Sequence, residues 1–162
     1  MSRVRIHPGE PPVRGRLLLR RRAPSTPVGK DELIDAIEGA LQEGGWVAAA
    51  DAPWLRMCLE EAVLNAVLHG NQGDPDLPVE VELRAEADRW MLLIADRGEG
   101  FRADDVPSMD GMDALVREHG RGIFLMNEWL DEMCYYRGGT LVWLARRRPD
   151  ADDTALEPGY AE

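Results

Sequence analysis

Apolar residues recur at helical spacing in three segments of the chain. In the segment 31–43 they form one stripe, which ends at a pair of glycines. A longer helix is expected from Asp51, a suitable N-cap, to His69, because the next residue, Gly70, is typical of a helix end. The third segment, 121–131, is amphipathic and follows a glycine. The pattern therefore predicts three main helices.

The other patterned segments have the features of strands. Residues 79–85 alternate apolar and polar side chains, whereas 90–95 is almost continuously apolar, as in a central strand. Residues 15–22 are expected to form an edge strand, and 133–136 with 140–146 a final hairpin that turns on two glycines. Helices on one face of a mixed, mostly antiparallel sheet make an α+β fold. We therefore predict a two-layer sandwich.

The longest predicted helix carries polar groups among its apolar residues. With Glu61 at zero on a helical wheel, Asn65 lies near about 40° and His69 near about 80°, and Leu64 and Leu68 flank them on one side. Burying such groups without partners would cost about 2 kcal/mol or more each. They therefore either belong to a buried hydrogen-bond network or line a polar cavity. At the helix end, His69 suits a capping or packing role.

A second group of residues follows the central strand. Asp96 ends this strand, and Gly98 and Gly100 allow the backbone to turn sharply and to approach a ligand closely. A carboxylate in this position could accept a hydrogen bond from the amino group of a purine. Taken alone, the pattern fits an ordinary turn equally well.

A third group precedes the last predicted helix. Gly120 and Gly122 bracket Arg121 just before an amphipathic run. Exposed N–H groups at a helix start, without bulky side chains, bind anions. A glycine hinge is the alternative interpretation.

Composition narrows the possible partners and compartment. The 162 residues suit one domain, and the net charge of −11 argues against nucleic acid or an anionic membrane as the main partner. The sequence has no run of 18 apolar residues and no signal-peptide pattern, so we expect a cytoplasmic protein. Cys58 and Cys134 lack metal-ligand spacing and are expected to be reduced packing residues. A basic arm, 1–13, and an acidic tail, 149–162, are expected to be flexible.

Taken together, three stretches of the chain resemble a known nucleotide site. Residues 60–71 (Glu-Glu-Ala-Val-Leu-Asn-Ala-Val-Leu-His-Gly-Asn), 96–101 (Asp-Arg-Gly-Glu-Gly-Phe) and 120–126 (Gly-Arg-Gly-Ile-Phe-Leu-Met) resemble the N-box, G1 box and G2 box of the GHKL ATPase superfamily, which has the Bergerat nucleotide-binding fold. Within it, they look most like the stand-alone anti-sigma factor serine/threonine kinases of bacteria. The resemblance implies a histidine-kinase-like ATPase domain over 14–148, with a lid at 102–119.

The resemblance also implies roles for individual residues. Glu61 would be the general base, Asn65 would supply a protein oxygen to Mg²⁺, and Asp96 would recognise the adenine of ATP. Arg121 would meet phosphate charge. Four glycines would allow the lid to close over the phosphates: Gly98, Gly100, Gly120 and Gly122.

The implied function is phosphoryl transfer from ATP to a serine or threonine of a small antagonist protein, together with binding of a sigma factor, as a homodimer. One departure from the family pattern favours an alternative. Many relatives have a lysine after the Gly-Asn of the N-box, and this chain has Gln72. The alternative is a nucleotide-gated protein-binding module without turnover. A weaker possibility is a structural domain that has lost the nucleotide.

Overall fold

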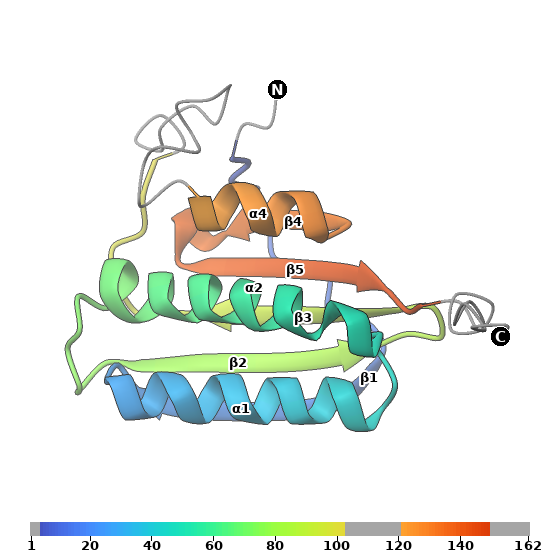
Figure 1. Cartoon of the computed structure of the whole chain (residues 1–162). Coiled ribbons are helices and arrows are strands. Elements are labelled where there is room, and N and C mark those ends of the chain that lie inside the picture. The colour runs from blue at the N-terminus through green and yellow to red at the C-terminus, as the bar shows by residue number, and fades with distance from the viewer. Residues whose placement is uncertain (1–3, 103–120, 150–162) are drawn as a thin grey trace, which may run out of the picture.

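The computed structural model describes residues 4–102 and 121–149. In this part of the chain one five-stranded sheet has the strand order β1-β2-β3-β5-β4, and every neighbouring pair is antiparallel (Figure 1). The strands are β1 (Arg16–Pro24), β2 (Pro78–Ala85), β3 (Arg89–Ala95), β4 (Glu132–Tyr136) and β5 (Leu141–Arg147). Three helices lie on one face: α1 (Pro27–Glu43), α2 (Ala52–Leu64) and α4 (Arg121–Trp129). The predicted α+β fold is confirmed.

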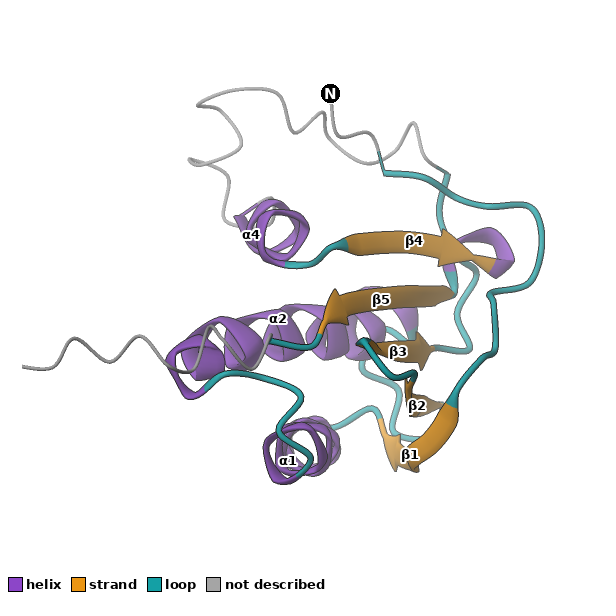
Figure 2. Ribbon diagram, turned by 90° about the vertical axis from the view of Figure 1, so that its right-hand side faces the viewer, coloured by secondary structure: helices purple, strands orange, loops and turns teal. Residues whose placement is uncertain are grey.

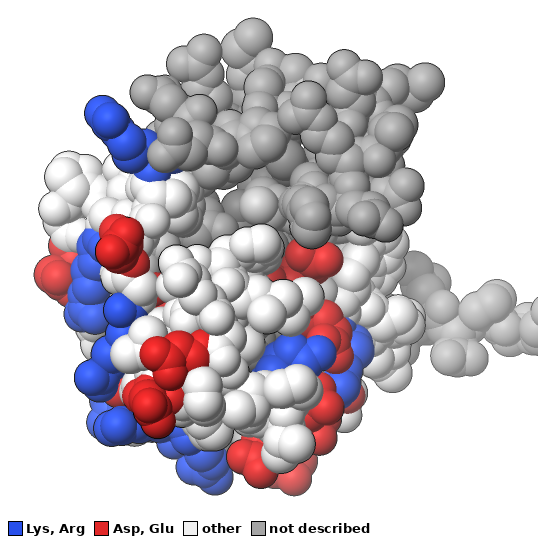
Figure 3. Space-filling view, turned by 90° about the vertical axis from the view of Figure 1, so that its left-hand side faces the viewer, with Lys and Arg blue, Asp and Glu red and all other residues white. Residues whose placement is uncertain are grey.

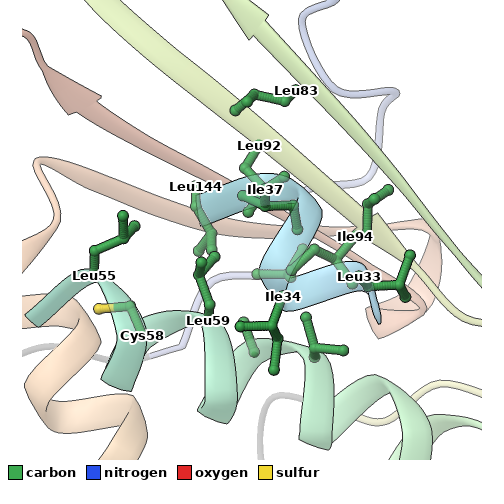
Figure 4. Packing of buried hydrophobic residues seen from close by; sticks show 14 of the residues in the cluster. Leu33, Ile34, Ile37, Leu55, Cys58, Leu59, Leu83, Leu92, Ile94 and Leu144 are labelled. Atoms are coloured by element: carbon green, nitrogen blue, oxygen red, sulfur yellow. The ribbon is translucent and has the colours of Figure 1, made fainter. Parts of the chain in front are cut away.

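The main core lies between the helices and the sheet. Alternate residues of the central strands face the helices, as the period of two along a strand requires. Figure 4 shows Leu83, Leu92 and Ile94 of the sheet among apolar side chains of α1 and α2. All of the labelled residues in this view are almost completely buried. The core thus fixes α2, which carries the first predicted motif, against the ends of β3 and β5.

The opposite face of the sheet has a smaller apolar cluster and an unexpected neighbour. Met91, Leu93 and Trp143 form this cluster together with residues of β4. The N-terminal arm passes along this side on its way to β1 (Figure 2). His7 N–H donates to the Tyr135 carbonyl over 2.8 Å, so the arm extends the edge of the sheet at β4. Residues 4–7, which we expected to be flexible, therefore have defined hydrogen bonds.

The start of one helix differs from the prediction, and the start of another lacks the expected side-chain cap. The first helix begins at Pro27, four residues earlier than expected, because the Thr26 side chain caps the Gly29 N–H over 3.0 Å. A short 3-10 turn, Ala49–Asp51, precedes α2, and the Asp51 side chain makes no capping hydrogen bond. It lies instead 3.2 Å from the Arg146 guanidinium of β5. Asp51 therefore occupies the N-cap position, as predicted, but its side chain does not cap the helix.

The buried face of α2 is also rotated from the predicted one. Val63 is 0% exposed and Val67 4%, whereas Leu68 is 50% exposed. The sheet and α1 together bury the valine side of the helix, which lies roughly opposite Glu61 on a helical wheel. Glu61 and Asn65 thus lie at the border of the buried face and not in its middle, next to the space that the site occupies.

Candidate functional site

A cavity of about 440 Å³ lies between the end of α2, the start of α4 and the ends of β3 and β5. This volume is within the range of small-molecule sites. Its polar lining side chains include Asn65, His69 and Asp96. Most of the remaining wall is apolar and comes from Val4, Ala62, Ala66, Ile94, Phe101, Ile123, Met126 and Val142. Such a wall suits the flat face of a base or another apolar ring.

The end of α2 widens into a π-helical turn, Asn65–Gly70. The Asn71 N–H donates to the Ala66 carbonyl over 2.9 Å, five residues back. Wide turns of this kind often occur at functional sites because they change the direction of the side chains. Here the turn carries both Asn65 and His69 into the cavity lining. The position of His69 at the helix end had suggested capping or packing.

Asp96 lies where β3 leaves the sheet. Its N–H donates to the Thr140 carbonyl over 2.9 Å, and its Oδ1 accepts from the Gly98 N–H over 2.8 Å. Burial raises the pKa of this carboxyl above its ordinary value, and the Gly98 N–H partly offsets the effect. Asp96 is thus a partly buried acceptor at one end of the cavity.

Two glycines explain how closely α2 and the Asp96 turn approach each other. A Cβ at Gly70 would lie 2.3 Å from the Asp96 Cγ, and a Cβ at Gly98 would lie 2.0 Å from the Gly70 carbonyl oxygen. Both distances are far below van der Waals contact. Both positions therefore require glycine, because a side chain would not fit. At Gly98 the clash would be with the backbone of Gly70, which cannot rotate away as a side chain can.

Asn71 is a site residue that sequence reasoning missed. Its side chain is 1% exposed, and its Nδ2 donates to Ser25 Oγ over 2.9 Å and to the Pro78 carbonyl over 3.0 Å. Its Oδ1 accepts from the Arg97 N–H over 2.7 Å. One buried amide thus joins the end of α2, the start of β2 and the residue after Asp96. An asparagine next to Gln-Gly-Asp-Pro signals only a turn, so the sequence held no sign of these distant partners.

Gly100 and Phe101 form another part of the wall. Gly100 has φ 76°, and a Cβ there would lie 2.1 Å from the Gly138 carbonyl oxygen. The Phe101 N–H donates to that same carbonyl over 3.0 Å, and its ring meets Tyr135 edge-on at 4.9 Å. Burial raises the pKa of Tyr135 to about 12, so its phenol is neutral at ordinary pH. The glycine thus brings an aromatic ring to the cavity.

The two adjacent glutamates of α2 have different surroundings. Glu60 lies 2.7 Å from the Lys30 Nζ and 3.3 Å from an Arg56 nitrogen, on the side that faces α1. Glu61 faces the start of α4, where a Cβ at Gly122 would lie 1.8 Å from its Cδ. The structure thus places Glu61, and not Glu60, beside the third predicted motif.

The remaining predicted residues lie in different parts of the molecule. Arg121 is the first residue of α4, and Gly122 is buried against Glu61. Gly120 lies outside the described residues, as does the predicted lid except for Arg102. Gln72 is exposed, has φ 54°, and is not part of the cavity lining. Gln72 therefore adds no side chain to the wall of this cavity.

The described residues contain no group of three His, Cys, Asp or Glu side chains that could hold a metal ion. Asn65 is therefore the candidate for a single protein oxygen on a cation whose other ligands come from elsewhere, an arrangement that Mg²⁺ commonly adopts with phosphates and water. Cys58 is buried and its pKa is raised to about 12, so it is a neutral thiol and not a nucleophile. No helix in the described residues is long and apolar enough to cross a membrane.

Comparisons with known proteins point to one family. Residues 24–146 match the histidine kinase-like ATPase domain. The serine-protein kinase RsbW of Listeria monocytogenes is 29% identical over 99 residues, which are 57% of this chain and 63% of that protein. The RsbW of Listeria innocua gives the same values. The RsbW of Bacillus licheniformis is 30% identical over 87 residues, 49% of this chain and 53% of that protein. Each match thus spans less than two thirds of the relative.

Proposed function

The chain belongs to the histidine kinase-like ATPase family, and on that premise we propose that it is an ATP-dependent serine/threonine protein kinase of the anti-sigma type. The site would bind ATP with Mg²⁺ and transfer the γ-phosphoryl group to a hydroxyl of an antagonist protein. A sigma factor would be its second partner, and the active form would be a homodimer. The names of the relatives, which are serine-protein kinases, support this choice of reaction.

The observation that carries the proposal is the joint placement of Asp96 and Asn65 in one largely apolar cavity. Asp96 offers a carboxylate to the amino group of adenine, and Ile94, Phe101 and Met126 offer apolar surface to the ring. Asn65 offers its amide oxygen to Mg²⁺ on the phosphate side. The positions of these residues in the cavity support a base site and a cation ligand in the order that ATP would need.

Glu61 is proposed as the general base. The acceptor oxygen would form a bond to the γ-phosphorus while the bond to the departing ADP oxygen breaks, and Glu61 would take the hydroxyl proton. The protein mainly has to position these groups and stabilise negative charge. Gly120, Arg121 and Gly122 would contribute backbone N–H groups and one cation where α4 begins. The predicted lid, 102–119, would exclude water over them.

A nucleotide-gated binding module without turnover is the second candidate, because a basic residue is absent at Gln72. Its neutral side chain supplies no charge for phosphate. In this case ATP would arrange the protein for a partner and would not be consumed. Phosphorylation of a partner separates the two candidates, because only a kinase adds a phosphoryl group to its partner.

The first experiment is titration calorimetry of the wild type, Asn65→Ala and Asp96→Ala with ATP, with and without Mg²⁺. We expect Asp96→Ala to abolish binding and Asn65→Ala to remove its Mg²⁺ dependence. Asp88→Asn, which changes an exposed aspartate in the β2–β3 turn, is the control and should bind as the wild type does. No binding by the wild type would refute both candidate functions.

The second experiment tests transfer. Proteins from the source organism are incubated with the chain and γ-labelled ATP, and labelled proteins are identified by mass spectrometry. We expect one small protein to be labelled on serine or threonine, and Glu61→Ala to reduce the labelling at least about 100-fold. Undiminished transfer by Glu61→Ala would contradict its role as base. Tight ATP binding without any labelled protein would favour the binding module.

A further inference from the structure

Four apolar side chains lie on the outward side of α2 and of the π-helical turn that follows it, on either side of Glu61. Trp54 is 44% exposed and Leu68 50%, and Met57 and Leu64 are partly exposed between them. Successive members of this set are separated by about one or two helical turns, so they lie in one row along the helix. We call Trp54, Met57, Leu64 and Leu68 the α2 stripe. At about 1.5 Å per residue it is about 20 Å long.

Such a row is unusual on the solvent side of a surface helix, where polar side chains are expected. The neighbouring surface on the α1 side is charged. Together α1 and α2 carry two basic and seven acidic side chains, and on the α1 side Arg56 is paired with Asp35 over 2.9 Å. Figure 3, which views the end where α2 finishes, shows the acidic and basic side chains that border the uncharged surface of this end. Contiguous apolar surface with a charged margin is typical of a protein-binding site.

Glu61 lies within this row. Met57 is one turn before it and Leu64 is about one turn after it, so a group that contacts the Glu61 carboxylate must also cover these neighbours. Gly122 closes the side toward α4, where a Cβ would lie 1.8 Å from the Glu61 Cδ. Glu61 therefore lies between the start of α4 and the α2 stripe.

We propose that the α2 stripe is the docking surface for the protein that accepts the phosphoryl group. This inference rests on the proposed kinase function. A general base must lie within hydrogen-bond reach of the hydroxyl that it deprotonates. The acceptor therefore has to sit on the stripe, with its serine or threonine over Glu61. A second copy of the chain or a sigma factor bound at this place would exclude the acceptor.

The chemistry of the stripe and its margin describes the partner. The partner should present an apolar patch around its serine or threonine, because Trp54 and Leu68 would otherwise remain in water at both ends of the contact. On the side that meets α1 it should be neutral or basic, because Asp31 and Asp35 are exposed there. A strongly acidic partner surface would be repelled at this margin.

The test compares a stripe variant with a matched control, and uses as probe the acceptor protein that labelling identifies. The variant is the double substitution Trp54→Gln and Leu68→Gln. The control is Leu17→Gln, which replaces a leucine of β1 that is 41% exposed. Each protein is assayed for ATP affinity by calorimetry, for thermal unfolding, and for transfer at increasing acceptor concentration. Hydrogen exchange of the chain with and without acceptor locates the contact.

For the stripe variant we expect an unchanged Kd for ATP and an unchanged unfolding midpoint. The KM for the acceptor should rise at least about tenfold with little change of kcat, because the substitutions remove binding and not chemistry. Leu17→Gln should match the wild type, and the acceptor should protect residues 54–68 from exchange. A stripe variant that phosphorylates its acceptor with normal KM would overturn the inference alone.

Two other outcomes overturn it in distinguishable ways. If sedimentation shows that the wild type is a dimer and the stripe variant a monomer, a second copy occupies the stripe. If the wild type labels no protein although it binds ATP, the proposed kinase function fails and the docking surface fails with it.

Discussion

The two ends of the cavity are held together by different kinds of contact. At one end, here called the base end, Gly70, Asn71, Asp96 and Gly98 interlock through backbone contacts and one buried amide. At the other, here called the transfer end, the Glu61 side chain rests against Gly122 of a different helix. Backbone cannot move aside without moving a strand, whereas a glutamate side chain can rotate. The base end is therefore built into the fold, and the transfer end is added to it.

This difference has a functional consequence. In the proposed function, recognition of a base would require an acceptor in a fixed position, and Asp96 at the end of β3 would supply it. Phosphoryl transfer requires groups that come together with the substrates, so a contact between side chain and helix start suits it better. Substitutions at the base end should thus affect stability and binding together. Substitutions at the transfer end should affect the use of Mg²⁺ and turnover, and leave stability nearly unchanged.

Gly98→Ala should have the largest effect. Its Cβ would lie 2.0 Å from the Gly70 carbonyl oxygen, so either α2 or the Asp96 turn has to shift. We expect the free energy of unfolding to fall by about 3 kcal/mol or more and ATP binding to be lost. Chemical denaturation and calorimetry measure the two effects. Gly39→Ala is the control, because its Cβ meets nothing within 4 Å in the middle of α1. It should stabilise the protein by about 0.5–1 kcal/mol.

Asn71→Ala should follow at the same end. The substitution leaves the Arg97 N–H and the hydroxyl oxygen of the buried Ser25 without their amide partner. We expect a loss of about 2–4 kcal/mol of stability, and a weaker ATP affinity because Asp96 is no longer held by the residue after it. Asn65→Ala changes the same residue type at the other end and should leave the unfolding free energy within about 0.5 kcal/mol. Equal destabilisation by both variants would remove the distinction between the two ends.

How much of this contrast the sequence predicts depends on how local each signal is. The period of apolar residues predicted the strands of the sheet and the layer of helices, and a strand followed by Asp-x-Gly-x-Gly indicated the position of Asp96. Thr26 and Pro27 were visible signals for an earlier start of α1 that the periodicity alone did not use. These features depend on neighbours in the chain.

The features that sequence reasoning missed depend on distant contacts. The Oδ1 of Asn71 accepts a hydrogen bond from a residue that is 26 positions later in the chain. Asp51 pairs with Arg146, which is 95 positions later. The buried side of α2 was misplaced because α1 and the sheet, and not the helix itself, decide whether Val67 or Leu68 meets solvent. A helical wheel gives the spacing of a face but not its direction in the fold.

Gly122→Ala should have a smaller structural effect than either base-end variant, although its Cβ has the shortest contact. The atoms that it meets belong to the Glu61 side chain, which can rotate away. We expect less than about 1 kcal/mol of destabilisation and nearly unchanged ATP affinity. Transfer should fall about 10-fold or more, because Glu61 leaves the position of a base. Single-turnover kinetics beside denaturation would show this split, and a collapse of stability would mean that the transfer end is as rigid as the base end.

The smallest expected effect is a pH dependence that belongs to the base end alone. Burial raises the pKa of Asp96 above the ordinary 3.8, and the ionised carboxylate is a stronger acceptor than the neutral carboxyl for the adenine amino group. The ATP affinity should therefore fall as the pH is lowered toward this raised pKa. The stability of the protein without ATP should change in the opposite direction. The folded state holds this proton more tightly than the unfolded chain, so this group adds stability as the pH falls. Asp96→Asn removes both trends, whereas Asp88→Asn keeps them. Calorimetry measures how ATP affinity changes with pH across the acidic range, and thermal unfolding measures how stability changes. If both changed in the same direction, Asp96 would not be the group that titrates.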